Sequence, residues 1–290
     1  MIGGMVVYGL INSAVFILMA IGFSLTFGIS GIANFAYGAF YIAGAYGCWH
    51  LLNTLGLPYF LALSISSLCT GMLGSVIYRF VLFRVRGNIL SEVIATFGLG
   101  MGILELFRSI GLTGHSYKLP KFMDGSLEIF GVYVDSQRLI IVGLALLFLV
   151  FLYLFTHYTR IGLAFRGIAQ DEQTALSFGI ESENTAMISM GIGSVLAALA
   201  AITIMPLSLI SVDEGSHILI LVLAVGIVGG IESTLGVIIA SMIFGFSQII
   251  VATYFTTHYT MLVMLGAIIL ILAVMPSGLF GKFKELEERV

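Results

Sequence analysis

The sequence predicts an all-α protein, a polytopic bundle of eight or nine transmembrane helices in which two helices are broken. Three observations predict this fold class. The 290-residue chain is 59% hydrophobic and only 9% charged, with a mean hydropathy of +1.12, whereas about a quarter of the residues of soluble domains are charged. The first 78 residues contain no Asp, Glu, Lys or Arg. The apolar runs extend over roughly twenty residues, the length that a helix needs to cross the hydrocarbon, rather than the roughly ten of a barrel strand.

Helices are favoured because they satisfy their own backbone hydrogen bonds in lipid. Charged and turn-forming residues divide the chain into nine predicted spans: 6–27, 34–52, 59–78, 88–107, 138–157, 185–207, 216–230, 233–254 and 260–275. No Lys or Arg precedes the first span, so we expect a retained helix and not a signal peptide. Cys48 and Cys69 lie in apolar segments, where small buried side chains are expected and not a disulfide or metal site.

Each predicted span ends at a recognisable signal. The first three end at 28–34, at 53–58, and between Arg79 and Gly87, in stretches containing Gly, Pro, Asn or Arg. The long polar segment 111–136 separates the fourth span from the fifth, and the charged segment 159–183 separates the fifth from the sixth. The last three spans are divided near Gly230 and at 256–260.

Basic residues predict the orientation of the bundle. They gather in three clusters: Arg79, Arg84 and Arg86; Arg160 and Arg166; Lys282, Lys284 and Arg289. The positive-inside rule places all three clusters on the cytoplasmic side, and the predicted spans give an even number of crossings between them. We therefore expect a single permease-like domain over 1–290, with an outward loop at 111–136, a cytoplasmic loop at 159–183 and a cytoplasmic tail at 276–290.

Two spans look interrupted. The span 216–230 is short and is followed by a glycine-flanked carboxylate, and a similar glycine-rich interruption occurs at 28–38. Broken helices free backbone groups at membrane depth, where they can line a polar cavity or hold the charged ends of an amino acid. The alternative is two ordinary interfacial turns with glycines that allow close helix packing. The residues predicted to line a translocation pathway are Ser30, Asn34, Tyr37, Gly229, Gly230, Glu232 and Ser233.

Four stretches of the sequence resemble the permease subunits of branched-chain amino-acid ABC transporters. They are Gly22–Gly28 with Asn34–Tyr41 and Gly44–Tyr46; Arg166–Glu172 with Ala175, Gly179 and Ile180; Gly229–Gly236; and Pro276–Gly281. The resemblance implies a subunit of an ATP-driven importer in the cell inner membrane, which translocates branched-chain or similar hydrophobic amino acids by alternating access. Relatives for urea, short amides or aromatic acids leave the substrate open.

The resemblance also implies partners. No Gly-x-x-x-x-Gly-Lys-Ser/Thr loop occurs in the chain, so we expect no ATP site and no enzymatic activity in this chain. ATP and Mg²⁺ would be bound by two cytoplasmic ATP-binding subunits. A second homologous permease subunit and an extracytoplasmic solute-binding protein would complete the importer, and no cofactor, metal or nucleic acid is expected on this chain.

The pattern of apolar residues in the cytoplasmic loop 159–183 predicts short helices with an apolar stripe. Asp171 is expected to cap such a helix, Glu172 to lie in its first turn, and Gly179 to end it. The resemblance makes this loop the one that couples the permease to the ATPase, through Arg166, Gly167, Ala169, Asp171, Glu172, Ala175 and Gly179. The alternative is a helix resting on lipid headgroups.

Three acids lie nearest to the apolar spans, and each needs a partner because a charge in hydrocarbon is costly. Glu105 is predicted to pair with Arg108 one turn away, and Glu92 to lie near Arg84 and Arg86. Glu232 has no local partner and is a candidate for the pathway or for a subunit contact. A proton-coupled carrier, which would titrate such an acid, is one rival function.

An intramembrane protease is a second rival, since 28–31 matches Gly-x-Ser-Gly and His157, His217 or His258 could act as a base. Four-residue matches are common in a chain with 35 glycines, and no further motif of such proteases accompanies this one.

Overall fold

A computed structural model describes residues 2–31, 33–112, 117–129, 131–230, 233–255, 259–275 and 278–280. Nine long helices within these residues correspond one to one to the nine predicted spans: α1 (Ile2–Ser30), α2 (Tyr37–Asn53), α3 (Tyr59–Ile77), α5 (Ile89–Ser109), α6 (Ser136–Tyr158), α9 (Ser182–Ile204), α10 (Val212–Gly229), α11 (Thr234–Tyr254) and α12 (Tyr259–Val274). The remaining elements are short: η1 (Tyr78–Leu82, a π-helix), α4 (Phe83–Val85), β1 (Ser126–Ile129), β2 (Val132–Asp135), α7 (Arg160–Gln170), α8 (Glu172–Ser177) and η2 (Met205–Leu207). The all-α class is confirmed.

The predicted number of spans is wrong. Seven of the helices in the described part of the chain are long and apolar enough to cross a membrane. The other two, α2 and α12, have 17 and 16 residues, which at 1.5 Å each give about 26 and 24 Å, less than the hydrocarbon thickness of about 30 Å. The helix α2 is buried over most of its length, so it is an internal element of the bundle and not a lipid-facing span.

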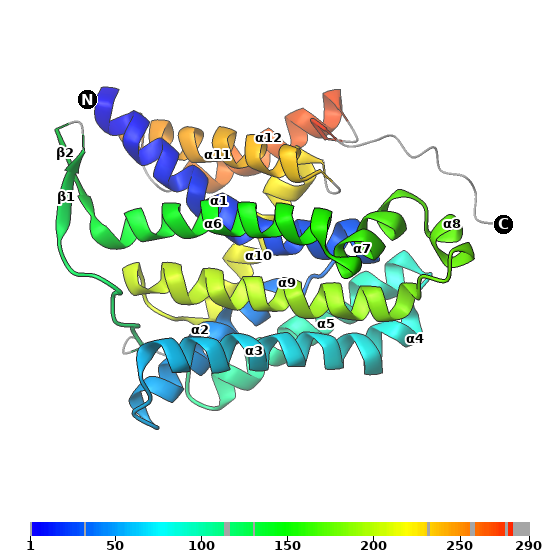
Figure 1. The fold of residues 1–290 in the computed structure, drawn as a ribbon. Helices are drawn as coiled ribbons and strands as arrows, with labels where there is room; N and C mark the ends of the chain where they lie inside the picture. Colours follow the sequence, from blue (N-terminus) through cyan, green and yellow to red (C-terminus); the bar gives the residue numbers. More distant parts are fainter. Residues whose placement is uncertain are drawn as a thin grey trace.

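Several of the long helices run roughly side by side, and others cross them at an angle. Figure 1 shows α3, α6, α9 and α11 nearly parallel, while α10 lies across them inside the bundle. The β-hairpin and the N-terminus lie at one end of the bundle, and α7 and α8 lie at the other (Figure 1). The end that carries α7 and α8 also carries Arg86, which bonds Glu172. The first two basic clusters therefore share one end, as the orientation requires.

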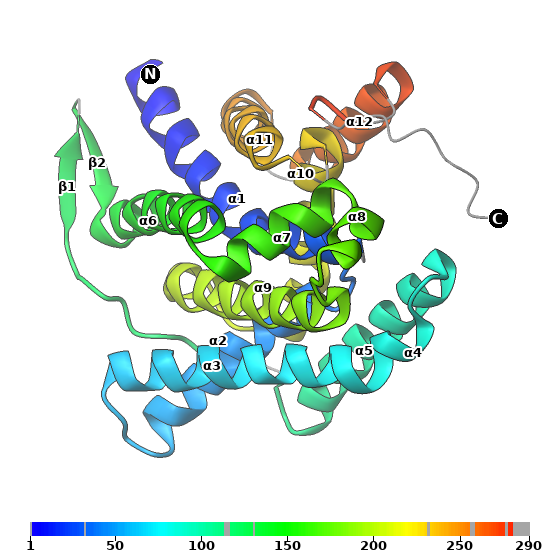
Figure 2. The ribbon, with the colours of Figure 1, turned by 45° about the vertical axis from the view of Figure 1, so that its right-hand side comes forward.

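The helix α9 lies at the centre of the bundle and packs against α1, α2 and α3 (Figure 2). Its buried positions are mostly small side chains: Ser189, Gly191, Gly193, Ser194, Ala197, Ala198, Ala200 and Ala201. Small residues let helix backbones approach closely where lipid gives no hydrophobic drive for association. The helices α3, α5, α6 and α12 cover the outside and expose many large apolar side chains, as lipid-facing helices do.

The loop 111–136, which is predicted to face outward, contains an element that the sequence analysis did not predict. Strands β1 and β2 pair antiparallel, with Ser126 opposite Asp135. Asp135 then caps α6 by accepting from the Gln137 amide at 2.9 Å, and it pairs with Lys121. The hydrogen bond from Lys121 holds the pKa of the Asp135 carboxyl below its ordinary value, so this loop is tied to the start of α6 at neutral pH.

The packing of α2 on α9 depends on a glycine, which gives a first prediction. A methyl group at Gly44 would lie 2.5 Å from the Ala198 Cα, and neither backbone can retreat. We expect Gly44→Ala to lower the free energy of unfolding by about 1 to 3 kcal/mol through overpacking, measured by thermal unfolding in detergent. The control is Gly143→Ala on α6, which meets no neighbour and should stabilise slightly, by up to about 1 kcal/mol. Equal melting temperatures for both variants would contradict this account.

Candidate translocation site and coupling loop

The first predicted break is a tight turn between α1 and α2. The helix α1 ends at Ser30, and Gly31 has a φ of +67°, the left-handed conformation that glycine adopts without strain. Ser30 Oγ donates to the Thr26 carbonyl at 2.7 Å. The Asn34 Oδ1 accepts from the Ala36 amide at 3.1 Å, and the Tyr37 amide donates to the Asn34 carbonyl. The amides of Ala36 and Tyr37 are thus satisfied within the turn.

Asn34 carries an unused donor in this turn. Its side chain is 1% exposed, yet its Nδ2 has no hydrogen-bond partner among the described residues. An unpaired amide donor in an apolar site costs about 1 to 3 kcal/mol. Such a group is a candidate to bind a passing solute.

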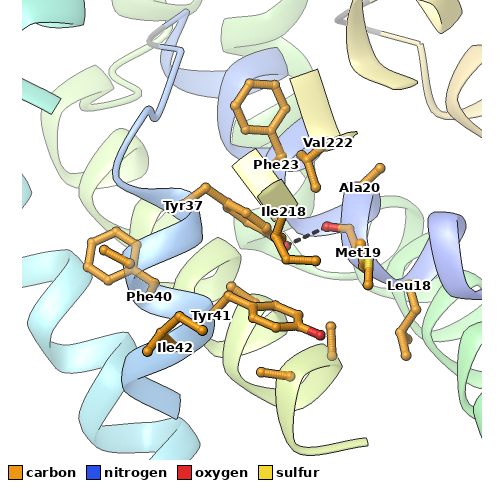
Figure 3. Packing of buried hydrophobic residues seen from close by; sticks show 14 of the residues in the cluster. Leu18, Met19, Ala20, Phe23, Tyr37, Phe40, Tyr41, Ile42, Ile218 and Val222 are labelled. Atoms are coloured by element: carbon orange, nitrogen blue, oxygen red, sulfur yellow. Dashed lines mark hydrogen bonds between the residues drawn. The ribbon is translucent and has the colours of Figure 1, made fainter. Parts of the chain in front are cut away.

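Tyr37 fixes the depth at which α2 begins. Its hydroxyl donates to the Met19 carbonyl at 2.7 Å, and its ring meets Phe23 edge-on at 5.9 Å (Figure 3). Met19 lies eleven residues before the end of α1, about 16 Å along the helix. The chain therefore re-enters the bundle after α1, and α2 starts near the middle of α1. The Tyr37 side chain is fully buried in this conformation.

At the second predicted break, α10 and α11 pack closely against each other at two glycines. The helix α10 ends at Gly229, and Gly230 has a φ of +93°. A methyl group on Gly229 would lie 2.5 Å from the Gly236 carbonyl carbon, so side chains are excluded where α10 meets α11. Ser233 caps α11 by accepting from the Gly236 amide at 3.1 Å. Glu232 lies outside the described residues.

The carbonyl groups at the end of α10 are occupied by the chain itself. The amides of Leu279 and Phe280 donate to the carbonyls of Val228 and Gly229 at 2.9 and 3.1 Å. In this conformation those two carbonyls are not available to a solute. The second break therefore has the close packing that the alternative interpretation expected, together with a backbone cap.

Phe23 connects the two breaks. Its ring contacts Tyr37, and a methyl group on Gly226 would lie 3.4 Å from the same ring. Gly226 precedes Gly229 by about one helical turn, so Tyr37 and the last turns of α10 both lie next to Phe23. Ser30 lies about two turns further along α1.

Polar residues on α10 were not among the predicted pathway residues. Gly215 packs directly on Gly38, since a methyl group at Gly38 would overlap the Gly215 carbonyl oxygen. The first turns of α10 thus lie at the depth of the start of α2. Ser216 and His217 are exposed there, and polar groups at membrane depth face water or protein rather than lipid. The sequence signal for a polar face on this helix was the pair Asp213 and His217, which are four residues apart and therefore lie on the same side of a helix.

An ion-pair cluster lies beside these residues. Arg108 at the end of α5 bonds Asp213 of α10 at 2.9 Å and also pairs with Glu105. The predicted Glu105 pair is confirmed, and the bond to Asp213 extends it to a second helix.

The predicted short helices of the loop 159–183 are confirmed as α7 and α8. Asp171 caps α8 by accepting from the Gln173 amide at 3.0 Å, and Glu172 is its first residue. The helix ends as expected at Gly179, whose φ is +79°. The Gly179 amide donates to the Leu176 carbonyl and the Ile180 amide to the Ala175 carbonyl, the hydrogen-bond pair of a Schellman motif.

The predicted coupling residues divide into an inner and an outer set. Ala175 is buried, Gly167 packs near Ile180, and Glu172 bonds Arg86 at 2.6 Å. These residues hold the loop on the bundle. Arg166, Asp171 and Gly179 are exposed, and Ala169 is partly exposed.

Two large apolar side chains of the loop were not among the predicted coupling residues. Leu176 is 51% exposed and Phe178 is 82% exposed, at the end of α8. An aromatic side chain so exposed next to the turn at Gly179 is a candidate anchor for a partner protein.

Comparisons with known proteins agree with this architecture. The sequence profile of the family described as "Branched-chain amino acid transport system / permease component" matches residues 5–273. The high-affinity branched-chain amino acid transport system permease protein LivH of Salmonella typhimurium is 26% identical over 94% of this chain and 94% of its own length. LivM of the same organism is 26% identical over 91% of this chain and 67% of its own length.

A solved structure shares the fold. A chain of PsaBC from Streptococcus pneumoniae, in complex with Fab, superimposes with a TM-score of 0.51 over 93% of this chain and 95% of that chain, at 15% identity.

The environment of Tyr37 gives a second prediction. Tyr37→Phe removes the bond to Met19 but keeps the ring contact with Phe23, so we expect it to lower the free energy of unfolding by about 1 kcal/mol. Tyr37→Ala should lower it by about 3 to 5 kcal/mol, because it leaves a cavity. Thermal unfolding in detergent measures both. Similar losses for the two variants would show that the ring is not packed as described.

Proposed function

The chain belongs to the family of branched-chain amino acid transport permease components, and on that premise we propose that it is a membrane-spanning subunit of an ATP-driven importer for branched-chain or similar hydrophobic amino acids. The observation that carries the proposal is the family match over residues 5–273, together with relatives whose names specify this substrate class. The chain is a multi-pass membrane protein, and we place it in the cell inner membrane.

The path for the solute would run beside the start of α2. Asn34 has a buried donor without a partner there, and Tyr37 and Phe23 close the site from the α1 side. The exposed Ser216 and His217 on α10 face the same level of the bundle. An amino-acid carboxylate would find the Asn34 amide as a donor, and its apolar side chain would find the aromatic rings.

A second permease subunit would complete the path. The face of α10 with Ser216 and His217 is unsuited to lipid, and the neighbouring helix α5 has Gly98 and Gly102 open on its surface, a spacing that favours close helix association. The likeness of this chain to both LivH and LivM of one organism supports a pair of homologous subunits.

ATP hydrolysis would reach this chain through α7 and α8. Two ATP-binding subunits, with ATP and Mg²⁺, would dock on the exposed side of this loop, where Arg166, Leu176 and Phe178 lie. Their closure would tilt the helices alternately, opening the Asn34 region to one side and then the other. An extracytoplasmic binding protein would deliver the solute at the opposite end.

Competitive uptake tests the substrate class. The assay uses vesicles that contain the chain, its partner subunits and the binding protein. Radiolabelled leucine should accumulate only when ATP is present on the side of the membrane that carries the ATP-binding subunits. Unlabelled isoleucine and valine should compete. Competition by urea, short amides or aromatic acids alone would assign the chain to another substrate, and accumulation by the purified chain without ATPase would overturn the proposal.

The exposed aromatic residue of α8 gives a further prediction. Phe178→Ala should weaken association with the ATP-binding subunit by about 2 kcal/mol or more, as expected for a buried aromatic anchor at an interface, measured by co-purification over a range of concentrations. Phe255→Ala is the control, since Phe255 is also exposed but lies at the far end of α11. Unchanged co-purification of the Phe178 variant would place the docking surface elsewhere.

A further inference from the structure

The helix α5 is held on the bundle by one face, which consists of a buried stripe and of the partly buried Ala95, Leu99, Ile103 and Phe107 beside it. Its buried positions recur at every fourth residue: Glu92, Thr96, Gly100 and Leu104. The positions between them are exposed or partly exposed, including Ile94, Phe97 and Met101. A helix held by one face can move as a rigid body at lower cost than the central helices, which are buried on several sides.

This stripe covers the first break. Thr96 Oγ1 lies 3.3 Å from the Ala33 carbonyl oxygen and 2.9 Å from the Glu92 carbonyl oxygen of its own helix. A methyl group on Gly100 would lie 3.0 Å from the Ala36 Cα. The rings of Phe97 and Phe35 meet edge-on at 6.5 Å. Asn34, with its unpaired amide, lies between Ala33 and Phe35. A displacement of α5 would therefore uncover the Asn34 turn.

The inner end of α5 is tied to the segment that precedes it. Asn88 caps the helix by accepting from the Ser91 amide, and the buried Glu92 carboxylate accepts from the Gly87 amide at 2.7 Å. These bonds fix Gly87 and its neighbour Arg86 to the first turn of α5, so force applied to Arg86 is carried into the helix.

Arg86 in turn joins this segment to the coupling loop. Its Nη2 donates to Glu172 Oε1 at 2.6 Å and to Ser182 Oγ at 2.6 Å, and Ser182 also bonds Glu172. The three side chains form a closed triangle between α4, the start of α8 and the start of α9. Arg86 and Glu172 are 19% and 37% exposed, so the pair is partly shielded from water and salt.

The π-helix η1 gives the segment a point at which to bend. It lies between α3 and α4, and π-helical turns frequently occur at functional sites. The Tyr78 hydroxyl, buried in this turn, has no hydrogen-bond partner among the described residues. The turn can therefore rearrange without breaking a bond of that side chain.

We propose that Arg86 is the positioning residue that transmits movement of α8 to α5, and that α5 covers and uncovers the Asn34 turn in response. The physical path is Glu172, Arg86, the Gly87–Glu92 turn, α5, and then Ala33 and Ala36 on either side of Asn34. The inference rests on the proposed function for the source of the movement, whereas the contacts that form the path do not depend on it. Arg86 acts through α5 and does not touch the solute.

The transport test compares solute moved with ATP hydrolysed. In the reconstituted importer, Arg86→Ala should lower the ratio of leucine transported to ATP hydrolysed by about tenfold, since coupling residues carry energies of that order, while ATP hydrolysis itself continues. The exchanged pair Arg86→Glu with Glu172→Arg should restore much of the ratio. Arg84→Ala is the matched control, because Arg84 bonds the Phe80 carbonyl one turn earlier in the same segment and not the coupling loop.

A labelling test is independent of transport. With Cys48 and Cys69 replaced by Ser, the variant Ala33→Cys reports how well α5 covers the turn through its rate of reaction with a small maleimide. Adding Arg86→Ala should raise this rate about tenfold, and Arg84→Ala should not.

The outcomes separate the two proposals. Wild-type vesicles that fail to accumulate leucine would overturn the proposed function, while the labelling rate would still decide the role of Arg86. An unchanged labelling rate in Arg86→Ala would overturn the inference, as would an exchanged pair that inserts but stays uncoupled. If Arg86→Ala alone does not insert, the exchanged pair decides: restored coupling supports the inference.

Discussion

The constraint on which the structure depends is that every backbone polar group at membrane depth must be satisfied by the protein. Unbroken helices meet it automatically, and the two breaks meet it by specific devices. At the first break, Asn34 accepts the Ala36 amide and gives its carbonyl to Tyr37. At the second, the backbone of Leu279 and Phe280 returns from the end of α12 to cover the last carbonyls of α10. The first break therefore uses local hydrogen bonds, whereas the second depends on a segment that is distant in the sequence.

Close helix packing follows from the same constraint. Lipid gives apolar helices no reason to associate, so contact must come from shape and from polar groups. Gly44 meets Ala198, Gly38 meets Gly215, and Gly245 meets Ser13 at points where even a methyl group is excluded. Most Ser and Thr hydroxyls of the interior bond a carbonyl of their own helix, as Thr26 does to Gly22. They are thus accommodated without requiring a partner helix.

Composition and turn signals were enough to predict all nine long helices and the ends of α8, because these depend on local chemistry: apolar length, Asp171 as a cap, Gly179 as a stop. The length criterion alone could not reveal that α2 begins inside the bundle, since that depends on the bond from Tyr37 to Met19 across eighteen residues. The cap from Leu279 and the bond from Arg86 to Glu172 join distant segments, and one sequence contains no signal for them. Phe178 is visible in the sequence as an aromatic residue of the loop, but only its exposure in the structure distinguishes it from a core residue.

The distribution of contacts explains how a bundle can be stable and still move. The central helices α1, α2 and α9 are interlocked by small residues, which resist displacement because any shift produces overlap or a void. The helix α5 is bound differently: by one face along its length, and by charged or polar contacts at its two ends, Glu92 with Gly87 and Arg108 with Asp213. Bonds at the ends of a helix can exchange for water or for other partners at the membrane surface, whereas buried apolar contacts cannot. A rigid core with an outer helix, α5, that is held at its ends is a physical arrangement that permits alternating access without unfolding the scaffold.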